Sequence, residues 1–262
     1  MAPASRTLPA LRATLAATLV AAVAAAVLTM LGAPASGSLS VDPPAPAPPA
    51  PAPSAPAPST RPLDRCPSGR VALTFDDGPS PTTTPAIVAV LRRMHVPATF
   101  FMVGSRVRQH PDVAREVAEA GFTIGNHTDD HVDLTGLSRT AIRTTLRRTE
   151  RALRDAGVED VSRYVRPPYG ATDAKVAGVL RATGRVMALW NVDSRDWEGL
   201  TPREIRSTTI DQVTARGRAG SVVLHHDGVA TSEATLAALP SEIRRLREAG
   251  YCLTPLPAGG LD

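Results

Sequence analysis

Two adjacent carboxylates stand where an apolar run of the chain ends. The sequence TFDDGP, residues 74–79, places Asp76 and Asp77 between a strand-like stretch and a Gly-Pro break. Asp-Gly pairs are common in turns, so these residues alone fit a turn as well as they fit chemistry. A second cluster, GNHTDDH, places His127 and His131 four residues apart, the spacing that brings two side chains onto one side of a helical turn.

Two histidines and one carboxylate are typical ligands of catalytic zinc, because three protein ligands leave one position open for water. Such an ion polarises a carbonyl group and lowers the pKa of its bound water. Adjacent residues of an extended strand point to opposite sides, so one aspartate would bind the metal while the other accepts a proton from the water. Spacing alone does not exclude three competing carboxylates, which are Asp129, Asp130 and Asp133.

Short apolar runs alternate with amphipathic ones between residues 64 and 262. The pattern predicts helices between strands at 70–75, 98–103, 122–126, 164–166, 186–192, 221–225 and 251–256. Pro111 and Pro202 fit the first turn of a helix, and Gly121 fits a helix end. We therefore predict an α/β fold, a distorted (β/α) barrel of about seven parallel strands, with an open doubly wound sheet as the alternative.

Polar motifs follow five of the predicted strands. In barrels of this kind, catalytic residues gather at the C-terminal ends of the strands. The aspartate pair follows the first strand and the histidine pair the third, and the later motifs are RPPYG at 166–170, NVDSRDW at 191–197 and LHHD at 224–227. We expect these five motifs to form one site.

The motifs TFDDGP, HTDDH, RPPYG, DSRDW and LHH occur in the order and spacing of the polysaccharide deacetylases, the carbohydrate esterases of family 4 with a NodB-homology domain. The chain resembles this family from about residue 71 to residue 256. The resemblance implies a distorted (β/α) barrel and a divalent metal, zinc first, with cobalt or nickel as alternatives. It also implies removal of acetyl groups from N-acetylglucosamine polymers or, in some members, from acetylated xylan.

The resemblance assigns roles to the residues of the first three motifs. Asp77, His127 and His131 resemble the metal ligands of the family. Asp76 resembles the catalytic base, and Arg166 the residue that pairs with that base and orients it. Arg166 could instead be a surface arginine at a rigid turn.

The later motifs carry the remaining roles. His226 resembles the catalytic acid and Asp196 its charge partner, because the family pattern Leu-x-His matches residues 224–226. The backbone N–H of Tyr169 resembles an oxyanion donor, and Trp197 a wall of the sugar-binding groove. Leu224 is the third residue that we expect at the substrate, together with Tyr169 and Trp197.

Three of these assignments have plain structural alternatives. Trp197 could be an ordinary core residue. The strand that carries His226 turns His225 to the other side, so we expect a structural role for His225. Asp227 fits a turn as well as a site.

The first quarter of the chain does not have the composition of a folded domain. Arg6 and Arg12 precede an apolar stretch at 13–31, and Ala33-Pro34-Ala35 fits a cleavage site, so residues 1–35 are predicted to be a signal peptide or an uncleaved membrane anchor. Residues 36–65 are rich in proline and alanine, which predicts a linker. The predicted catalytic domain is 66–262.

Composition limits the partners and suggests one covalent link. The net charge of +4 and the aromatic content of 3% give no nucleic-acid signature. Cys66 and Cys252 are the two cysteines of a chain that is predicted to be exported, which favours a disulfide over two unrelated buried thiols.

These observations predict a secreted or envelope-associated, metal-dependent deacetylase. Its partner would be an N-acetylated glycan, with peptidoglycan first and chitin oligomers second. An acetyl xylan esterase on the same scaffold is the alternative, and a non-catalytic glycan-binding module is a more distant one. We expect a monomer that contacts a membrane only through an uncleaved N-terminal segment.

Overall fold

The computed structural model describes residues 66–259. The predicted signal segment, 1–35, and the linker, 36–65, lie outside the described residues. Across the described part of the chain, each helix is too short or too polar to cross a bilayer.

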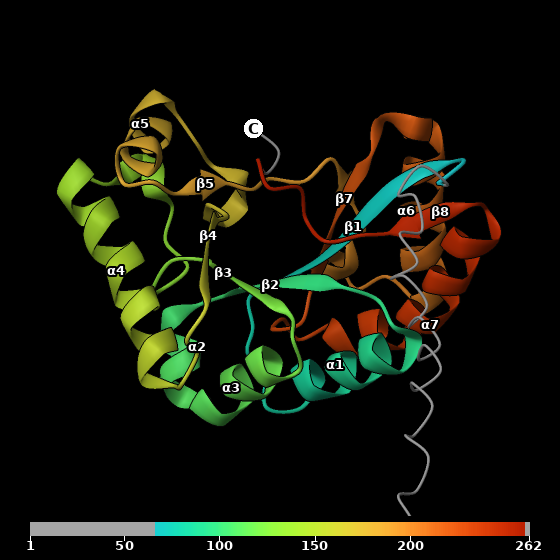
Figure 1. Ribbon diagram of the computed structural model, residues 1–262, viewed down its shortest axis with the longest axis horizontal. Coiled ribbons are helices and arrows are strands. Elements are labelled where there is room, and N and C mark those ends of the chain that lie inside the picture. Colours follow the sequence, from blue (N-terminus) through green and yellow to red (C-terminus); the bar gives the residue numbers. More distant parts are fainter. Residues whose placement is uncertain (1–65, 260–262) are drawn as a thin grey trace, which may run out of the picture. The chain divides into compact units, whose positions relative to one another are not determined.

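The described residues form one parallel sheet with helices packed against it (Figure 1). The strand order is β5-β4-β3-β2-β1-β7-β6, and β8 pairs with the beginning of β1. The strands are β1 Gly69–Asp76, β2 Ala98–Met102, β3 Thr123–Asn126, β4 Val161–Val165, β5 Val186–Met187, β6 Val192–Asp193, β7 Ser221–His226 and β8 Tyr251–Leu253. All of the strand pairs are parallel, which confirms the predicted α/β class.

The barrel is curled but not closed by strand pairing. The predicted strand at 186–192 forms two short strands at opposite edges of the sheet, because β5 pairs with β4 whereas β6 pairs with β7. The chain crosses between the two edges at 188–191. There Ala188 N donates to Val165 O at 2.9 Å, and Asn191 N donates to Val222 O at 3.1 Å. This crossing segment bridges the two edges of a half-barrel.

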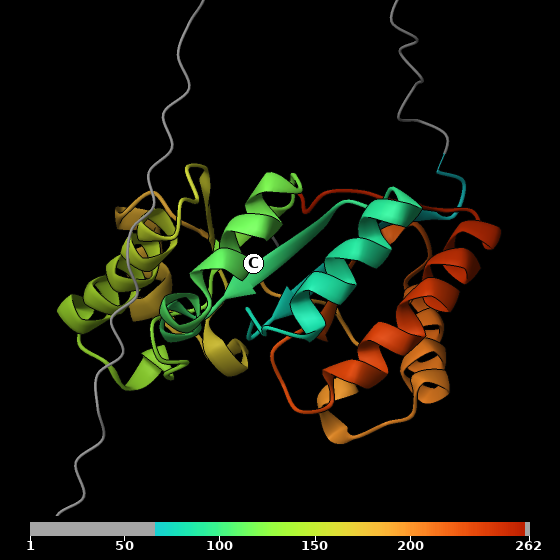
Figure 2. The same ribbon diagram turned by 90° about the horizontal axis from the view of Figure 1, so that it is seen from below.

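The helices cover the outer face of the sheet. They are α1 Thr83–Met94, α2 Gly104–Gln109, α3 Pro111–Glu119, α4 Arg139–Asp155, α5 Ala174–Ala182, α6 Pro202–Arg216 and α7 Ser232–Glu248. The two views show α1 and α3 side by side on the outer face of the sheet (Figures 1 and 2). Helix α4 packs against α5, and α6 packs against α7. Pro111 and Pro202 each begin a helix, as predicted.

Apolar side chains fill both faces of the curled sheet. The main core lies between β1, β2 and the helices and includes Phe75, Phe100 and Leu91. A smaller cluster inside the curl contains Phe101 and Ala188, with Trp190 packed against it. The amphipathic runs between the predicted strands therefore form helices whose apolar sides are buried in these clusters or in a third one shared by α4 and α5.

The ends of the described domain are joined covalently. Cys66 and Cys252 form a disulfide with an S–S distance of 2.07 Å, which confirms the predicted pairing. The bond is geometrically accessible because β8 lies beside the first residues of β1. It closes a loop of 186 residues.

Candidate active site

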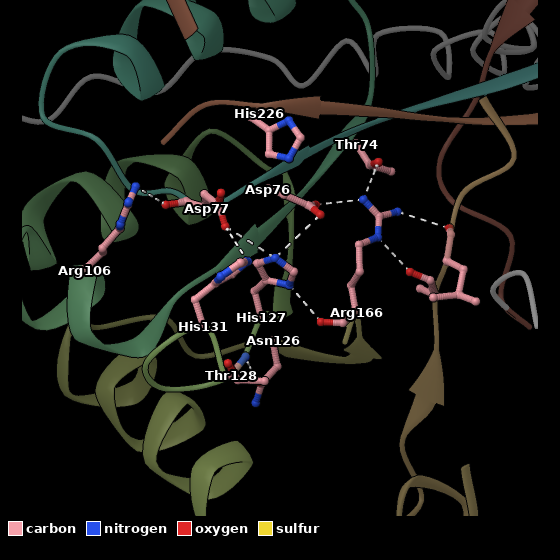
Figure 3. Close-up of polar contacts among 12 residues, drawn as sticks. Thr74, Asp76, Asp77, Arg106, Asn126, His127, Thr128, His131, Arg166 and His226 are labelled. Atoms are coloured by element: carbon pink, nitrogen blue, oxygen red, sulfur yellow. Dashed lines mark hydrogen bonds and ion pairs between the residues drawn. The ribbon is translucent and has the colours of Figure 1, made fainter. Parts of the chain in front are cut away.

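Three side chains from two strand ends converge on one point (Figure 3). Asp77 follows β1, and His127 and His131 follow β3. Oδ1 of Asp77 lies 3.4 Å from Nε2 of His127 and 3.2 Å from Nε2 of His131. The three atoms lie within 4.8 Å of one another, which is close enough for one cation to contact all of them.

The hydrogen bonds around this cluster fit a metal site. Nδ1 of His127 is 2.7 Å from the carbonyl oxygen of Arg166, so Nδ1–H donates to that carbonyl and the Nε2 lone pair is directed at Asp77. Oδ1 of Asp77 is buried without a hydrogen-bond partner. An imidazole lone pair and a carboxylate repel each other unless a proton or a metal cation lies between them. The donor set of two nitrogens and one oxygen is that of a catalytic zinc site.

The Asp77 carboxyl is held in its ionised form. Burial raises its pKa, but the hydrogen bond and charge of His127 and the charge of His131 outweigh burial and lower the pKa to about 2. Burial in turn lowers the pKa of His131, more than the charge of Asp77 raises it. Both shifts favour the protonation states that bind a metal.

Left-handed backbone brings these side chains together. Asp77, Thr128 and His131 have φ values of 71°, 67° and 53°. Residues 127–131 are not helical, so the expectation that a helical turn pairs the two histidines was wrong: a loop pairs them. Non-glycine residues at positive φ are costly, and they cluster at functional sites.

The same backbone feature changes the relation between the two aspartates. Asp76 ends β1, and the left-handed turn at Asp77 aims both carboxylates into one pocket, contrary to the alternation expected of a strand. Oδ2 of Asp76 lies 3.7 Å from Nε2 of His127, slightly farther than Asp77. The competing carboxylates point elsewhere: Asp129 accepts from Arg108, Asp133 caps a 3-10 turn, and Asp130 is exposed.

A fully buried arginine holds Asp76. Nη1 of Arg166 donates to Oδ1 of Asp76 at 2.7 Å and to Oγ1 of Thr74 at 2.8 Å. The guanidinium also donates to the carbonyl oxygens of Ala188 and Leu189, in the crossing segment, at 2.8 and 3.2 Å. Arg166 therefore is not a surface residue. It fixes one oxygen of Asp76 and leaves the other facing the pocket.

His226 lies on the opposite side of the aspartates from the two histidines (Figure 3). Its Nδ1 is 2.7 Å from Oδ1 of Asp196, and its backbone N–H donates to Oδ2 of Asp196 at 2.8 Å. Thr235, on α7, donates to the same Oδ2 at 2.6 Å. Burial lowers the pKa of His226, but the contact with Asp196 outweighs it and raises the pKa above the ordinary value.

The site opens into a cavity of about 470 Å³. Tyr169 and Trp197 are 72% and 52% exposed, so Trp197 is not a core residue, and both line this cavity. Tyr169 has a φ of 60°, which is a fourth left-handed position at the site. The complete lining is Asp76, Asp77, His127, His131, Tyr169, Trp190, Asp193, Trp197, Leu224, His226 and Val229.

Several residues of the site carried no usable sequence signal. Nη1 of Arg106, on α2, donates to the carbonyl oxygens of Asp77 (2.7 Å) and Gly228 and so ties together the loops after β1 and β7. A Cβ on Gly228 would lie 2.0 Å from Asp77 O, so only glycine lets the loop after β7 approach the loop after β1 this closely.

Asp227, which the sequence left open between a turn and a site, is buried. It accepts a hydrogen bond from Thr84, and burial raises its pKa to about 7.

Comparisons with known proteins agree with the geometry. The family model for polysaccharide deacetylase matches residues 64–188. A chitooligosaccharide deacetylase of Azorhizobium caulinodans is 34% identical over 198 residues, which are 71% of this chain and 92% of that protein. The chain belongs to the polysaccharide deacetylase family.

Other members of the family share the domain and its fold. The peptidoglycan-N-acetylglucosamine deacetylase PgdA of Listeria monocytogenes is 34% identical over 187 residues, 70% of this chain but 37% of PgdA. The crystal structure of the Bc1960 peptidoglycan N-acetylglucosamine deacetylase has a TM-score of 0.68 and 28% identity, and the match covers 76% of this chain and 90% of that chain. The half-barrel is thus the fold of this polysaccharide deacetylase domain.

Proposed function

We propose that this chain is an exported, metal-dependent hydrolase that removes acetyl groups from N-acetylglucosamine residues of a wall or chitin-like glycan. The observation that carries the proposal is the placement of a metal-ligand triad, a buried carboxylate and an oriented imidazole around one open cavity. The family and the deacetylase activities for which its relatives are named support the same reaction class.

Asp77, His127 and His131 would hold a divalent cation, with zinc as the first choice. Bound there, the cation would supply Lewis acidity toward the acetyl carbonyl and would lower the pKa of a coordinated water. The lining offers no further histidine near the triad except His226, on the other side of the aspartates. Three protein ligands leave room for water and substrate.

Asp76 is the proposed base. Its Oδ1 is occupied by Arg166, so Oδ2 is the oxygen that can accept a proton from the attacking water. The hydrogen bond from Arg166 holds the Asp76 carboxylate and prevents its rotation. The Tyr169 N–H is the proposed donor to the oxyanion that develops on the acetyl carbonyl, because Tyr169 lines the same cavity.

His226 is the proposed acid. Asp196 accepts the Nδ1–H of His226, which leaves Nε2 as the nitrogen that can donate a proton to the departing amine. An amide nitrogen must be protonated before the C–N bond breaks, so an acid on the far side of the aspartates suits deacetylation. Acetate and a free amino sugar are the products.

The exposed rings beside the cavity favour a sugar polymer as substrate. Trp197 and Tyr169 are the large hydrophobic side chains exposed among residues 66–259, and pyranose faces stack on such rings. Relatives that act on chitooligosaccharides and on peptidoglycan N-acetylglucosamine have similar identity to this chain, so both polymers are candidate substrates. We infer an envelope or extracellular location from these substrates and from the predicted signal segment.

Acetate release tests the proposal. Purified protein loaded with zinc should release acetate from chitin oligomers or peptidoglycan, and Asp76→Asn protein should not. Release from acetylated xylan alone would make the protein an esterase. Binding to the glycans without acetate release from any of the three would make it a binding module.

A further inference from the structure

A chain of buried ionisable groups continues behind His226. His225, the preceding residue of β7, lies with Nδ1 3.8 Å from Oδ2 of Asp196 and with Nε2 3.0 Å from Oε1 of Glu242, on α7. Asp196, His225 and Glu242 each have 0% exposed surface. We refer to His226, Asp196, His225 and Glu242 as the His226–Glu242 chain. In it, two imidazoles alternate with two carboxylates.

Two buried carboxyl groups, of Asp196 and Glu242, flank the ring of His225. Ionised groups inside a protein are stable only when they are paired and hydrogen-bonded. Asp196 accepts hydrogen bonds from His226 and Thr235, whereas within residues 66–259 the side chain of Glu242 is hydrogen-bonded only to His225. An imidazolium carries an N–H on both ring nitrogens and can face both carboxylates, whereas a neutral imidazole carries one.

The surroundings of His225 support the charged form. Burial lowers the pKa of His225, but the charge of Glu242 and the contact with Asp196 outweigh burial and raise the pKa to about 10. Toward β1 the ring stacks on the apolar ring of Phe75, with centroids 5.6 Å apart. Asp196 on the η3 turn, Asp196–Glu198, and Glu242 on α7 are the charged groups that face it within the described chain.

We propose that Glu242, acting through a charged His225, is a positioning residue for proton donation by His226. The inference rests on the proposed function, in which Nε2 of His226 gives its proton to the leaving amine. In that step the Nε2–H bond breaks, an N–H bond forms on the amine, and no proton moves along the rest of the chain. Asp196 stays anionic throughout.

The charge on His225 matters at the moment of transfer. Once His226 has given up its proton, its ring no longer offers a positive charge to Asp196. The ring of His225 stays positive and balances the Asp196 carboxylate, so the transfer does not leave a buried negative charge without a partner. If His225 were neutral, Asp196 would hold the proton of His226 more tightly, and amide cleavage would slow.

An apolar double variant separates this role from a structural one. H225L/E242L replaces a buried ion pair by leucines of comparable size, a change that is often neutral for stability. We expect it to fold, to keep its KM, and to lose about tenfold in kcat on an N-acetylated chitin oligomer, a typical cost of removing a group that orients a catalytic residue. Turnover of an activated acetyl ester, which needs less acid assistance, should change little. Glu248→Gln, an exposed change on the same helix, is the matched control.

Nuclear magnetic resonance of protein labelled with ¹⁵N-histidine gives a readout independent of turnover. At about pH 8, above the ordinary histidine pKa, both ring nitrogens of His225 should be protonated in the wild type. Glu242→Gln should convert this residue to the neutral form. The His225→Leu spectrum assigns the signal.

Two results would overturn the inference: a folded double variant with wild-type amide turnover, or a neutral His225 in the wild type at this pH. A wild-type protein that releases no acetate from any glycan would refute the proposed function instead. In that case the ¹⁵N spectrum still decides whether His225 carries the charge.

Discussion

Replacing Arg166 by methionine removes the one buried cation that joins the base to the crossing segment. Its guanidinium, with no exposed surface, donates to Asp76, Thr74, Ala188 and Leu189. Breaking a buried ion pair from one side costs roughly 3–5 kcal/mol, because the remaining charge is stranded. Each carbonyl left without a donor adds about 1–3 kcal/mol. The cost of breaking the ion pair already includes part of the cost of the two carbonyls. We therefore expect Arg166→Met to lose about 4–5 kcal/mol in the free energy of unfolding.

Urea and thermal unfolding of metal-free protein measure this loss. For a domain of this size, 1 kcal/mol shifts the melting temperature by about 2–4 °C, so Arg166→Met should melt about 8–20 °C lower. Arg163→Met, an exposed change on β4, the strand that Arg166 follows, should melt within a few degrees of the wild type. The double change D76N/R166M should recover part of the loss, because the stranded charge is gone. A loss below about 1 kcal/mol in Arg166→Met would refute the reasoning.

The remaining predictions concern the metal, the acid and the disulfide. His127→Ala should lose bound zinc and activity, whereas His110→Ala, away from the triad, should keep both; metal analysis of the purified proteins checks this. Asp76→Asn should keep the metal but lose turnover, and equal metal loss in Asp76→Asn and Asp77→Asn would show that the two roles are misassigned. His226→Ala should lose about 10²–10⁴-fold on an amide and distinctly less on an activated acetyl ester, so equal losses would reject it as the acid. Thiol titration of unfolded, unreduced protein should find no free cysteine, and two free thiols would contradict the disulfide.

The sequence alone predicted the fold class and the meeting of the five polar motifs at one edge of the sheet. Strand-length apolar runs alternated with helical stripes, and polar motifs followed five of the runs. Because parallel strands present their carboxyl ends at one edge of a sheet, motifs up to 150 residues apart, such as Asp76 and His226, had to meet there. The pairing of Cys66 with Cys252 also followed, since a domain that is predicted to be exported and has two cysteines offers one partner for each.

Only the tertiary structure decided how the side chains face one another. Sequence periodicity describes regular backbone, and the site is built from irregular backbone: Asp77, Thr128, His131 and Tyr169 are left-handed, so neither strand alternation nor helical spacing applies to them. These conformations are held by contacts from distant elements, among them the bonds of Arg106 to the loops after β1 and β7.

The same limit explains the parts that were missed. The apolar run at 186–192 reads as one strand, yet it forms two, because the gap between the edges of the half-barrel is set by how far β4 and β7 curl apart. Glu242 lies on the buried face of α7 beside Leu239 and Leu246, and nothing near it in sequence predicts a partner. Its partner, His225, comes from β7, and a buried charge is recognised only when the side chain that compensates it is seen in space.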